Sequence, residues 1–455
     1  MKIVVQGLGF VGAAMATAIA SKSNDNQKFE VIGIDLPNDL GNRRIDSINM
    51  GEFPFKTNDK KLVSELKNSV EKGFLKATSD SSVYEKADIV LVSVNCDLIE
   101  HNNNKIIDLE GFKKSIGEIS NKVGEETLII VETTVPPGTC ERIVFPIFEE
   151  AFKNRNLDIT KLYLAHSYER VMPGKNYLDS IINFWRVYSG INEKSALKCK
   201  NFLEKIVNTK EYPLRKLKNT TASETSKVLE NSYRALNIAF MEEWGRFSED
   251  VGIDIFEIVE AVRERPTHSN IMQPGFGVGG YCLTKDPLFA KIAARDIFKI
   301  DGHSFTFSTQ SVDINSKMPE VTLKKIEEYF NGNLKGKNLL LLGATYRQDV
   351  GDTRFSPSEY FAKGVIAKNC MLTVCDPLIE FWDEMKMEIK NVVPNLSNFD
   401  VVVFAVKHKE FSKIDFSDIS LSDNTLIFDA NNVLTKTQTE YLKSSNLNYA
   451  SIGRG

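Results

Sequence analysis

A glycine-rich turn at the start of the chain constrains the fold more than any other feature. The apolar run KIVVQ leads into GLGFVG at residues 7–12, which opens the alanine-rich stretch AAMATAIAS. This order predicts a strand, a tight turn and a helix, with glycines that let the backbone approach a pyrophosphate at the helix N-terminus. The residues predicted to line this cofactor site are Gly7, Gly9, Phe10, Val11 and Gly12.

An acidic residue follows the turn at the spacing of a dinucleotide-binding fingerprint. The next apolar run, EVIGID, ends at Asp35. A carboxylate at this place binds the ribose diol and disfavours a 2′-phosphate, so we expect NAD as the cofactor. Arg43 and Arg44 lie a little further along and leave NADP open.

The strand rhythm occurs twice, which predicts an α/β fold. Two Rossmann-like, doubly wound parallel-sheet domains are expected, joined by a central helical region. The second copy has Gly343-Ala344-Thr345-Tyr346-Arg347 in place of the glycine fingerprint, so we expect it to hold a different nucleotide. The further predicted strands are 87–94 and 127–132 in the first copy, and 338–343, 372–376, 400–406 and 425–429 in the second.

A long helix is predicted between the two copies. A capping box at Thr221–Glu224 would begin it, and Gly252 would end it. A helix of roughly 30 residues usually buries one face against another domain or subunit, so a homodimer or higher homo-oligomer is expected. The expected domains are a cofactor domain (1–205), a central dimerisation region (206–315) and a C-terminal nucleotide-sugar domain (316–455).

Composition excludes several classes of protein. The chain has 455 residues, 26% of them charged, with a formal net charge of −4, so a nucleic-acid-binding role is not expected. Six cysteines without a CxxC pair favour reduced thiols, and the dispersed histidines predict no metal site. The opening segment does not resemble a signal peptide, and no apolar run is long enough to span a membrane. We therefore expect a cytoplasmic protein.

A second glycine-rich stretch, GFGVGGYCLTKDP at 275–287, carries Cys282 directly behind its glycines. On the long helix Lys227 and Asn231 are one turn apart and share a face. A thiol that attacks an aldehyde needs such groups to hold the oxyanion, and Asp286 could act as a base in hydrolysis. Taken singly, these residues are ordinary: an inert cysteine, a solvated lysine, a helix-packing amide and a helix cap. Their combination with a dinucleotide fold favours chemistry.

These motifs resemble those of the nucleotide-sugar 6-dehydrogenases, which include UDP-glucose, GDP-mannose and UDP-N-acetylhexosamine dehydrogenases. The resemblance covers nearly the whole chain. It implies an NAD domain, a central dimerisation region and a UDP-binding domain, and oxidation of a sugar's primary alcohol to a carboxylate with two NAD. It also implies a role in surface polysaccharide synthesis. The matching stretches are GLGFVG, TTVPPGT, YERVMPG, SETSKVLENSYRALNIAF, GFGVGGYCLTKDP and GATYRQDVGDTRFSP.

The resemblance also implies roles for individual residues. Cys282 falls on the family's nucleophile, Lys227 and Asn231 on its oxyanion-stabilising pair, and Asp286 on the carboxylate that assists hydrolysis. Thr134 falls on a threonine that helps to hold the catalytic water beside the cofactor. Arg354 matches a family element with either a structural or a functional role. The residues expected at the substrate, besides Lys227 and Asn231, are Glu169, Arg170, His268, Gly279, Tyr346 and Arg347.

Several positions depart from the family pattern. The stretch YERVMPG, with Pro173 before its glycine, is closer to the N-acetylhexosamine branch, so a UDP-N-acetylhexosamine is the expected substrate. UDP-glucose and GDP-mannose remain alternatives. The other departures are VNCDL at 94–98, His268 near the place of an arginine that reaches into a neighbouring subunit, and Asn431 where relatives commonly carry arginine.

Two other classes of function stay open. A two-electron dehydrogenase of the hydroxyacid type would use Lys227 and Asn231 without the thiol. A nucleotide-sugar sensor would bind its ligand without turnover. Loss of Cys282 and production of NADH distinguish these hypotheses.

Overall fold

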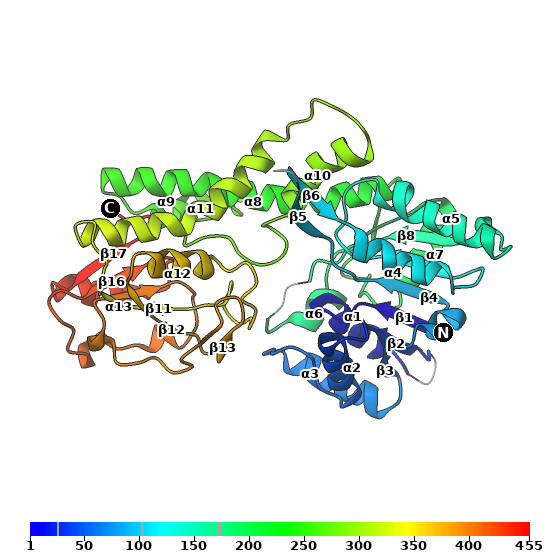
Figure 1. Cartoon of the computed structure of the whole chain (residues 1–455), viewed down its shortest axis with the longest axis horizontal. Helices are drawn as coiled ribbons and strands as arrows, with labels where there is room; N and C mark the ends of the chain where they lie inside the picture. The colour runs from blue at the N-terminus through cyan, green and yellow to red at the C-terminus, as the bar shows by residue number, and fades with distance from the viewer. Residues whose placement is uncertain (25–26, 102–103, 172–173) are drawn as a thin grey trace. The chain divides into compact units, whose positions relative to one another are not determined.

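The computed structural model describes the chain except residues 25–26, 102–103 and 172–173. The chain forms two compact units, which are described separately. Unit 1 contains Met1–Glu230 and Phe289–Ser304, and unit 2 contains Asn231–Leu288 and Phe305–Gly455. Helix α8 (Thr220–Val251) contributes residues to both units (Figure 1).

Unit 1 is built on an eight-stranded sheet with β1 near its middle. All neighbouring strands are parallel except β8 and β9, which are antiparallel. The predicted doubly wound fold is confirmed, with this one reversal as an addition. In spatial order the strands are β10 (Arg215–Lys216), β9 (Val187–Gly190), β8 (Tyr163–His166), β7 (Leu128–Val131), β4 (Ile89–Val92), β1 (Lys2–Gln6), β2 (Glu30–Ile34) and β3 (Leu75–Thr78).

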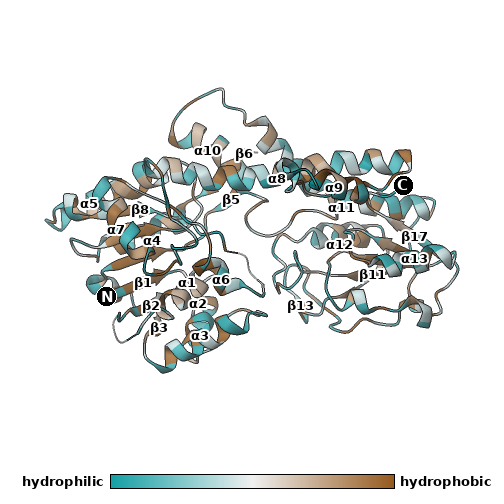
Figure 2. Cartoon of the chain, turned by 180° about the vertical axis from the view of Figure 1, so that it is seen from behind, coloured by the Kyte–Doolittle hydropathy of each residue, from teal (hydrophilic) through white to brown (hydrophobic). Residues whose placement is uncertain are grey.

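Helices cover both faces of this sheet, so its central strands are buried on both sides. This explains why β4 (IVLV) and β7 (LIIV) are uninterrupted apolar runs without alternating polar residues. Hydrophobic residues accordingly concentrate along the strands (Figure 2). The helices are α1 (Phe10–Ala20), α2 (Asp39–Asn49), α3 (Lys60–Glu71), α4 (Glu110–Ser120), α5 (Phe145–Asn154), α6 (Tyr177–Ile182), α7 (Glu193–Leu203) and α10 (Phe289–Ile292).

The VNCDL segment leads from β4 into an antiparallel hairpin. Its strands are β5 (Asp97–His101) and β6 (Asn104–Asp108), and Cys96 just before them is buried. The departure from the family pattern thus coincides with an element that the strand analysis did not predict.

Unit 2 contains a second sheet of five strands, all parallel, as predicted for the C-terminal copy. Its spatial order is β12 (Met371–Cys375), β11 (Asn338–Leu342), β15 (Val401–Phe404), β16 (Leu426–Asp429) and β17 (Asn448–Ser451). The other elements are α9 (Ile255–Arg263), α11 (Thr306–Tyr329), α12 (Pro357–Ala367), α13 (Lys436–Ser444) and the small hairpin β13 (Phe381–Trp382) and β14 (Met387–Glu388).

The predicted long helix is α8, and its C-terminal signal is confirmed: the helix ends at Val251, and Gly252 has φ +76°. The predicted capping box is wrong. The side chain of Asn219 accepts the N–H of Ala222 at 2.9 Å, and the helix begins at Thr220. Glu224 instead turns its carboxylate to the backbone of a different segment, described below.

No helix in the part of the chain that the structure describes is both long and apolar enough to cross a membrane.

Candidate active site

The glycine turn between β1 and α1 forms a preorganised anion site. A Cβ on Gly12 would lie 1.8 Å from the carbonyl oxygen of Gly7, so the turn can close only with glycine at residue 12. A Cβ on Gly9 would meet nothing within 4 Å, which leaves the space in front of the helix N-terminus open. No side chain caps α1, and its first turn carries no acidic residue. These features suit the pyrophosphate of a dinucleotide. Phe10 stacks on Phe55 with ring centroids 4.0 Å apart, and the side chain of Val11 is partly exposed.

Asp35 lies directly after β2 and joins the glycine turn. Its carboxylate accepts the N–H of Leu8 at 3.1 Å and that of Leu36 at 2.8 Å. The guanidinium of Arg44 lies 3.2 Å from the same carboxylate, while Asp35 is still 9% exposed. The sequence left open whether Arg44 receives a 2′-phosphate; here it is paired with Asp35. The residues therefore fit NAD.

Thr134 lies in the loop after β7 and is partly buried. Glu224 of α8 anchors this loop, because its carboxylate accepts the N–H of Gly138 at 2.6 Å and that of Cys140 at 2.8 Å. Burial raises the pKa of Glu224 to about 7, although these hydrogen bonds act in the opposite direction. The acid that resembled a capping residue thus connects α8 to the segment that holds Thr134.

The segment after β8 contacts α8 in unit 1. Lys227 is buried, and its ammonium donates to the carbonyl oxygen of Glu169 at 2.9 Å. Arg170 forms an ion pair with Glu230 and donates to the carbonyl oxygen of Trp185 at 2.8 Å. The hydrogen bond to Glu230 is the main reason that the pKa of Arg170 is raised. This part of the structure brings Glu169, Arg170 and Lys227 together; Pro173 lies outside the described residues.

Cys282 is exposed, whereas the other five cysteines are buried, and none of the six forms a disulfide. The chain turns sharply after Cys282, since its carbonyl oxygen accepts the N–H of Asp286 at 2.9 Å. The buried carboxylate of Asp286 accepts a hydrogen bond from Asn231 Nδ2 at 2.7 Å and one from Lys285 Nζ at 2.8 Å. Three of the predicted catalytic residues therefore form one connected group in unit 2.

The loop after β11 packs on the same glycine-rich stretch. Gly280 has φ +80°, and a Cβ there would lie 2.7 Å from the ring of Tyr346; a Cβ on Gly279 would be equally close to the Tyr346 Cβ. Burial raises the pKa of Tyr346 to about 12, so its hydroxyl stays protonated at neutral pH. Arg347 beside it is exposed. The expected substrate residues Gly279 and Tyr346 thus lie side by side on the stretch that leads to Cys282, and Arg347 follows Tyr346 in the same unit.

Arg354 has a structural partner. Its guanidinium binds Asp352 through two nitrogens, at 3.0 and 2.8 Å, and lies 5.7 Å from the ring centre of Tyr281. The backbone N–H of Tyr346 also donates to the carbonyl oxygen of Asp352, at 3.0 Å. Arg354 therefore supports the loop that carries Tyr346, which favours the structural of its two expected roles.

Two of the departures have defined surroundings. His268 lies in the exposed turn Pro266–His268, with Nδ1 2.8 Å from Thr267 Oγ1. Asn431 joins two segments: its Nδ2 donates to the carbonyl oxygen of Ala405 at 2.8 Å, and its Oδ1 accepts the N–H of Phe276 at 3.4 Å. Asn431 thus holds the start of the glycine-rich stretch against the second sheet.

The sequence analysis missed two residues of these groups: Glu230 and Lys285. Lys285 adjoins Asp286 in the motif itself, and Glu230 lies three residues after Lys227 on α8, so helical spacing could have found it.

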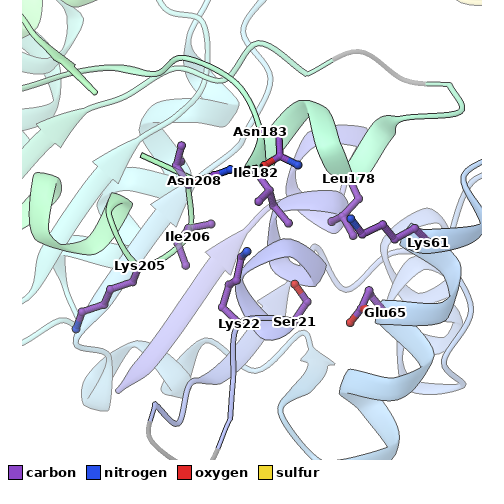
Figure 3. A pocket seen from close by; sticks show the side chains of 11 residues that line it. Ser21, Lys22, Lys61, Glu65, Leu178, Ile182, Asn183, Lys205, Ile206 and Asn208 are labelled. Carbon is purple, nitrogen blue, oxygen red and sulfur yellow. Dashed lines mark hydrogen bonds between the residues drawn. The ribbon is translucent and has the colours of Figure 1, made fainter. Parts of the chain in front are cut away.

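Unit 1 also contains a cavity of about 450 Å³ (Figure 3). Residues from the end of α1, from α3, from α6 and from 205–208 line it, among them Lys22, Lys61 and Asn183. None of the expected site residues contributes to its wall, so we do not include it in the candidate active site. Among the described residues, no group of three or more His, Cys, Asp or Glu side chains could hold a metal ion.

Three domains of one protein family match the chain in order. The NAD binding domain of the UDP-glucose/GDP-mannose dehydrogenase family matches residues 1–208, the central domain residues 221–317 and the UDP binding domain residues 340–436. The chain belongs to this family. It is an NAD-dependent nucleotide-sugar dehydrogenase, as the resemblance of its motifs implied.

Individual relatives cover almost all of this family member. A UDP-N-acetyl-D-mannosamine dehydrogenase of Methanocaldococcus jannaschii is 30% identical over 96% of this chain and 93% of its own length. An NDP-N-acetyl-D-galactosaminuronic acid dehydrogenase of Ralstonia solanacearum is 26% identical over 91% of this chain and 92% of its own.

Among solved structures, a UDP-D-ManNAc dehydrogenase of Pyrococcus horikoshii covers all of both chains with a TM-score of 0.81 and 24% identity. At this identity the likeness establishes the fold, which is that of the nucleotide-sugar dehydrogenases.

Proposed function

We propose that the chain oxidises the C6 hydroxymethyl group of a UDP-N-acetylhexosamine to the carboxylate, with Cys282 as the nucleophile. The observation that carries this proposal is the exposed Cys282 beside the hydrogen-bonded Asn231–Asp286–Lys285 group. The other five thiols are buried and poorly suited to react with a sugar. We assign NAD binding to residues 1–205, subunit contacts to 206–315 and UDP-sugar binding to 316–455.

In the first half of the reaction the sugar alcohol becomes an aldehyde, which Cys282 then attacks. The new bond joins Sγ to C6, and the carbonyl oxygen becomes the oxyanion of a hemithioacetal. Lys227 and Asn231, one turn apart on α8, stabilise this oxyanion with an ammonium and an amide donor. NAD supplies the chemistry that these side chains lack, by accepting a hydride in each of the two oxidations.

In the second half the hemithioacetal loses a hydride and becomes a thioester. Asp286 orients a water molecule or takes its proton, the water attacks C6, and the C–S bond breaks to return the thiolate. Thr134 helps to hold this water. Overall, one alcohol, two NAD⁺ and one water give one carboxylate, two NADH and three protons.

Residues 168–170 determine which sugar the enzyme accepts. Arg170 is fixed by Glu230 and Trp185, so its position is defined before a substrate arrives. A guanidinium is suited to the carbonyl oxygen of an N-acetyl group, which glucose and mannose lack. Relatives at up to 30% identity named UDP-N-acetyl-D-mannosamine dehydrogenase support this class over UDP-glucose or GDP-mannose. Its uronic acid product would enter surface polysaccharide synthesis.

The free cysteines indicate the cellular compartment in which the enzyme works. A nucleophile with five further thiols, none in a disulfide, needs a reducing compartment, so we place the enzyme in the cytoplasm.

We further propose a homodimer or higher homo-oligomer formed through α8. Large apolar side chains lie exposed along one stripe of this helix at spacings of three and four residues, as in a helix–helix interface. Phe240→Asp should therefore halve the particle mass measured by light scattering, whereas Lys324→Glu on α11 should leave it unchanged. An unchanged mass in Phe240→Asp would contradict this interface. The stripe is made of Leu229, Tyr233, Leu236, Phe240, Trp244, Phe247 and Val251.

The test of the proposed function is the number of NADH formed per sugar. The purified protein is incubated with NAD and UDP-N-acetyl-D-mannosamine, UDP-N-acetylglucosamine, UDP-glucose or GDP-mannose. We expect two NADH per sugar for a UDP-N-acetylhexosamine, and no acid from Cys282→Ser or Cys282→Ala. One NADH per sugar in both the wild type and Cys282→Ser would instead identify a two-electron dehydrogenase. Binding without NADH would identify a sensor.

A further inference from the structure

A buried ion pair lies between the glycine turn and the segment that fixes Arg170. The guanidinium of Arg186, just before β9, pairs with the carboxylate of Glu132, just after β7. Arg186 is 4% exposed and Glu132 is 2% exposed, so both charges are removed from water. Because such a pair is costly to desolvate, its presence alone is weak evidence for a role in stability. The contacts of each partner indicate what the pair connects within unit 1.

On one side the pair reaches the glycine turn through Ser93. Ser93 follows β4, and its hydroxyl donates to Glu132 Oε2 at 3.1 Å. The same residue packs against two glycines of the turn: a Cβ on Gly7 would lie 2.7 Å from the Ser93 carbonyl oxygen, and one on Gly12 would lie 3.4 Å from the Ser93 Cβ. A change in the position of Glu132 would therefore move the residue on which the turn rests.

On the other side the pair adjoins the residue that fixes Arg170. Trp185 precedes Arg186, and the carbonyl oxygen of Trp185 accepts a hydrogen bond from Arg170 Nη1 at 2.8 Å. Arg186 also lies against α1, with its Nη1 3.9 Å from the sulfur of Met15. A guanidinium presents several donors in one planar fork, so Arg186 can bind Glu132 and contact α1 at the same time. The contacts from the glycine turn to Arg170 are thus continuous.

We propose that Glu132 and Arg186 are positioning residues that couple binding of the cofactor to binding of the sugar. A ligand at the glycine turn restricts Ser93 and thereby Glu132, and a ligand at Arg170 restricts the segment of Arg186. The ligand that binds second then meets a partly ordered site and loses less conformational freedom. This inference rests on the proposed function in one respect, the placement of the sugar at Arg170. Such coupling is reciprocal, so each ligand raises the affinity for the other by the same factor.

Isothermal titration of UDP-N-acetyl-D-mannosamine with and without saturating NADH measures the coupling. NADH occupies the cofactor site but cannot accept a hydride, so no sugar is oxidised during the titration. We expect about tenfold tighter binding of the sugar nucleotide in the presence of NADH. UDP has no sugar that could reach Arg170, so it should bind equally well with and without NADH.

Two mild substitutions interrupt the contacts at different points. Ser93→Ala removes the hydroxyl that joins Glu132 to the turn, and Arg186→Lys keeps the buried charge but loses the fork of donors. Each should reduce the coupling to about twofold or less, while the affinity for NADH alone changes less than about threefold. Because both act on the same series of contacts, the double variant should lose no more coupling than either single variant.

An arginine elsewhere in unit 1 provides the matched control. Arg155 donates to the carbonyl oxygens of Ser120 and Val123, at 2.8 and 2.7 Å, so Arg155→Lys also disturbs a partly buried guanidinium but should keep the full coupling. In the wild type, NADH alone should slow hydrogen exchange in the peptide that covers residues 183–187. This measurement tests the inference even where a variant fails to fold.

The outcomes distinguish this inference from the proposed function. The inference is overturned by equal sugar-nucleotide affinity with and without NADH, by unchanged hydrogen exchange, by coupling that persists in both variants, or by an equal loss in Arg155→Lys. This holds even where Cys282→Ser abolishes formation of the acid. Coupling lost in Ser93→Ala and Arg186→Lys supports the inference, and turnover retained by Cys282→Ser would then overturn the proposed function alone. If NADH production identifies another UDP-sugar as the substrate, that sugar nucleotide is used in the titration.

Discussion

In both Rossmann-like sheets of this enzyme an acidic side chain holds the turn after the first strand. The two turns differ in function. In unit 1 Asp35, after β2, accepts the N–H of Leu8 in the turn after β1. In unit 2 Asp376, after β12, accepts the N–H groups of Ala344 and Thr345 in the turn after β11, at 2.9 and 3.0 Å. An acid at the end of the second strand thus stabilises the turn in both units.

The difference lies in what remains available to a ligand. Asp35 is buried but keeps 9% exposure, and α1 begins at Phe10, immediately after an open and uncapped turn. Asp376 is fully buried, and its carboxylate also bonds Thr345 Oγ1 and His408 Nε2, at 3.0 and 3.1 Å. In unit 2 a long loop precedes α12, which begins at Pro357 with Ser356 as its cap.

The comparison teaches that one scaffold can serve two purposes through a single connection. Unit 1 retains a short turn with a helix N-terminus for a pyrophosphate, whereas unit 2 lengthens the same connection into the loop that carries Tyr346, Arg347 and Arg354. Its acid then has a purely structural role.

The largest effect is expected from Gly12→Ala. The added Cβ would lie 1.8 Å from the carbonyl oxygen of Gly7, so the turn must open. We expect NAD affinity to fall at least about 100-fold, or ~2.7 kcal/mol, in isothermal titration, with UDP affinity unchanged. Gly117→Ala on α4 adds a Cβ that meets nothing within 4 Å and serves as the control. Normal NAD affinity in a folded Gly12→Ala protein would refute the assignment of the cofactor to this turn.

The next largest effect distinguishes the role of Asp35 in cofactor binding from the role of Asp376 in stability. Asp376→Asn replaces an acceptor with a donor beside buried N–H groups and should cost about 2 kcal/mol of unfolding free energy in urea, with NAD affinity unchanged. Asp35→Asn should weaken NAD about tenfold, or ~1.4 kcal/mol, and improve NADP relative to NAD, because Arg44 loses its partner. If Asp376→Asn weakened NAD as strongly as Asp35→Asn, the two turns would not differ as described.

A smaller effect concerns the pH dependence of stability. Burial raises the pKa of Glu224 from 4.5 to about 7, so the folded enzyme binds an extra proton between these values. The contribution of Glu224 to stability is therefore largest below about pH 4.5 and falls as the pH rises through 7. The contribution of Asp376 to stability depends on pH in the opposite direction. Burial alone would raise the pKa of Asp376, but the hydrogen bonds from His408 and from the backbone lower it below the ordinary value. This contribution is therefore lost as the pH falls.

Thermal unfolding at several pH values tests this opposition. The stability difference between wild type and Glu224→Gln should shrink by about 1 kcal/mol or more between pH 5 and pH 8. A difference that stays constant across this range would show that Glu224 titrates normally.

Much of the fold could be predicted because its strands are buried on both faces and read as continuous apolar runs. The antiparallel pair β8–β9 and the hairpin β5–β6 could not, since pairing direction is not encoded in a local pattern. The prediction of a capping box was wrong for a related reason. Thr221 and Glu224 have the spacing of a capping box, but the Glu224 carboxylate accepts the backbone N–H groups of Gly138 and Cys140 instead.

The candidate site could be predicted as a set of residues more readily than as an arrangement. Motifs named Cys282, Asn231 and Asp286, but the hydrogen bond between Asn231 and Asp286 joins residues far apart in sequence. The contact of Asn431 with Phe276 depends in the same way on the packing of the second sheet.

The most direct test of the account is to trap the covalent intermediate. Asp286→Asn slows thioester hydrolysis without removing the nucleophile, so the intermediate should accumulate. The variant is mixed with NAD and UDP-N-acetyl-D-mannosamine, quenched in acid and digested for mass spectrometry. The account predicts the mass of the acyl sugar on the peptide that contains Cys282, and none when Cys282→Ser is added to the variant. Acid formed with two NADH per sugar by Cys282→Ser, without any adduct, would contradict it.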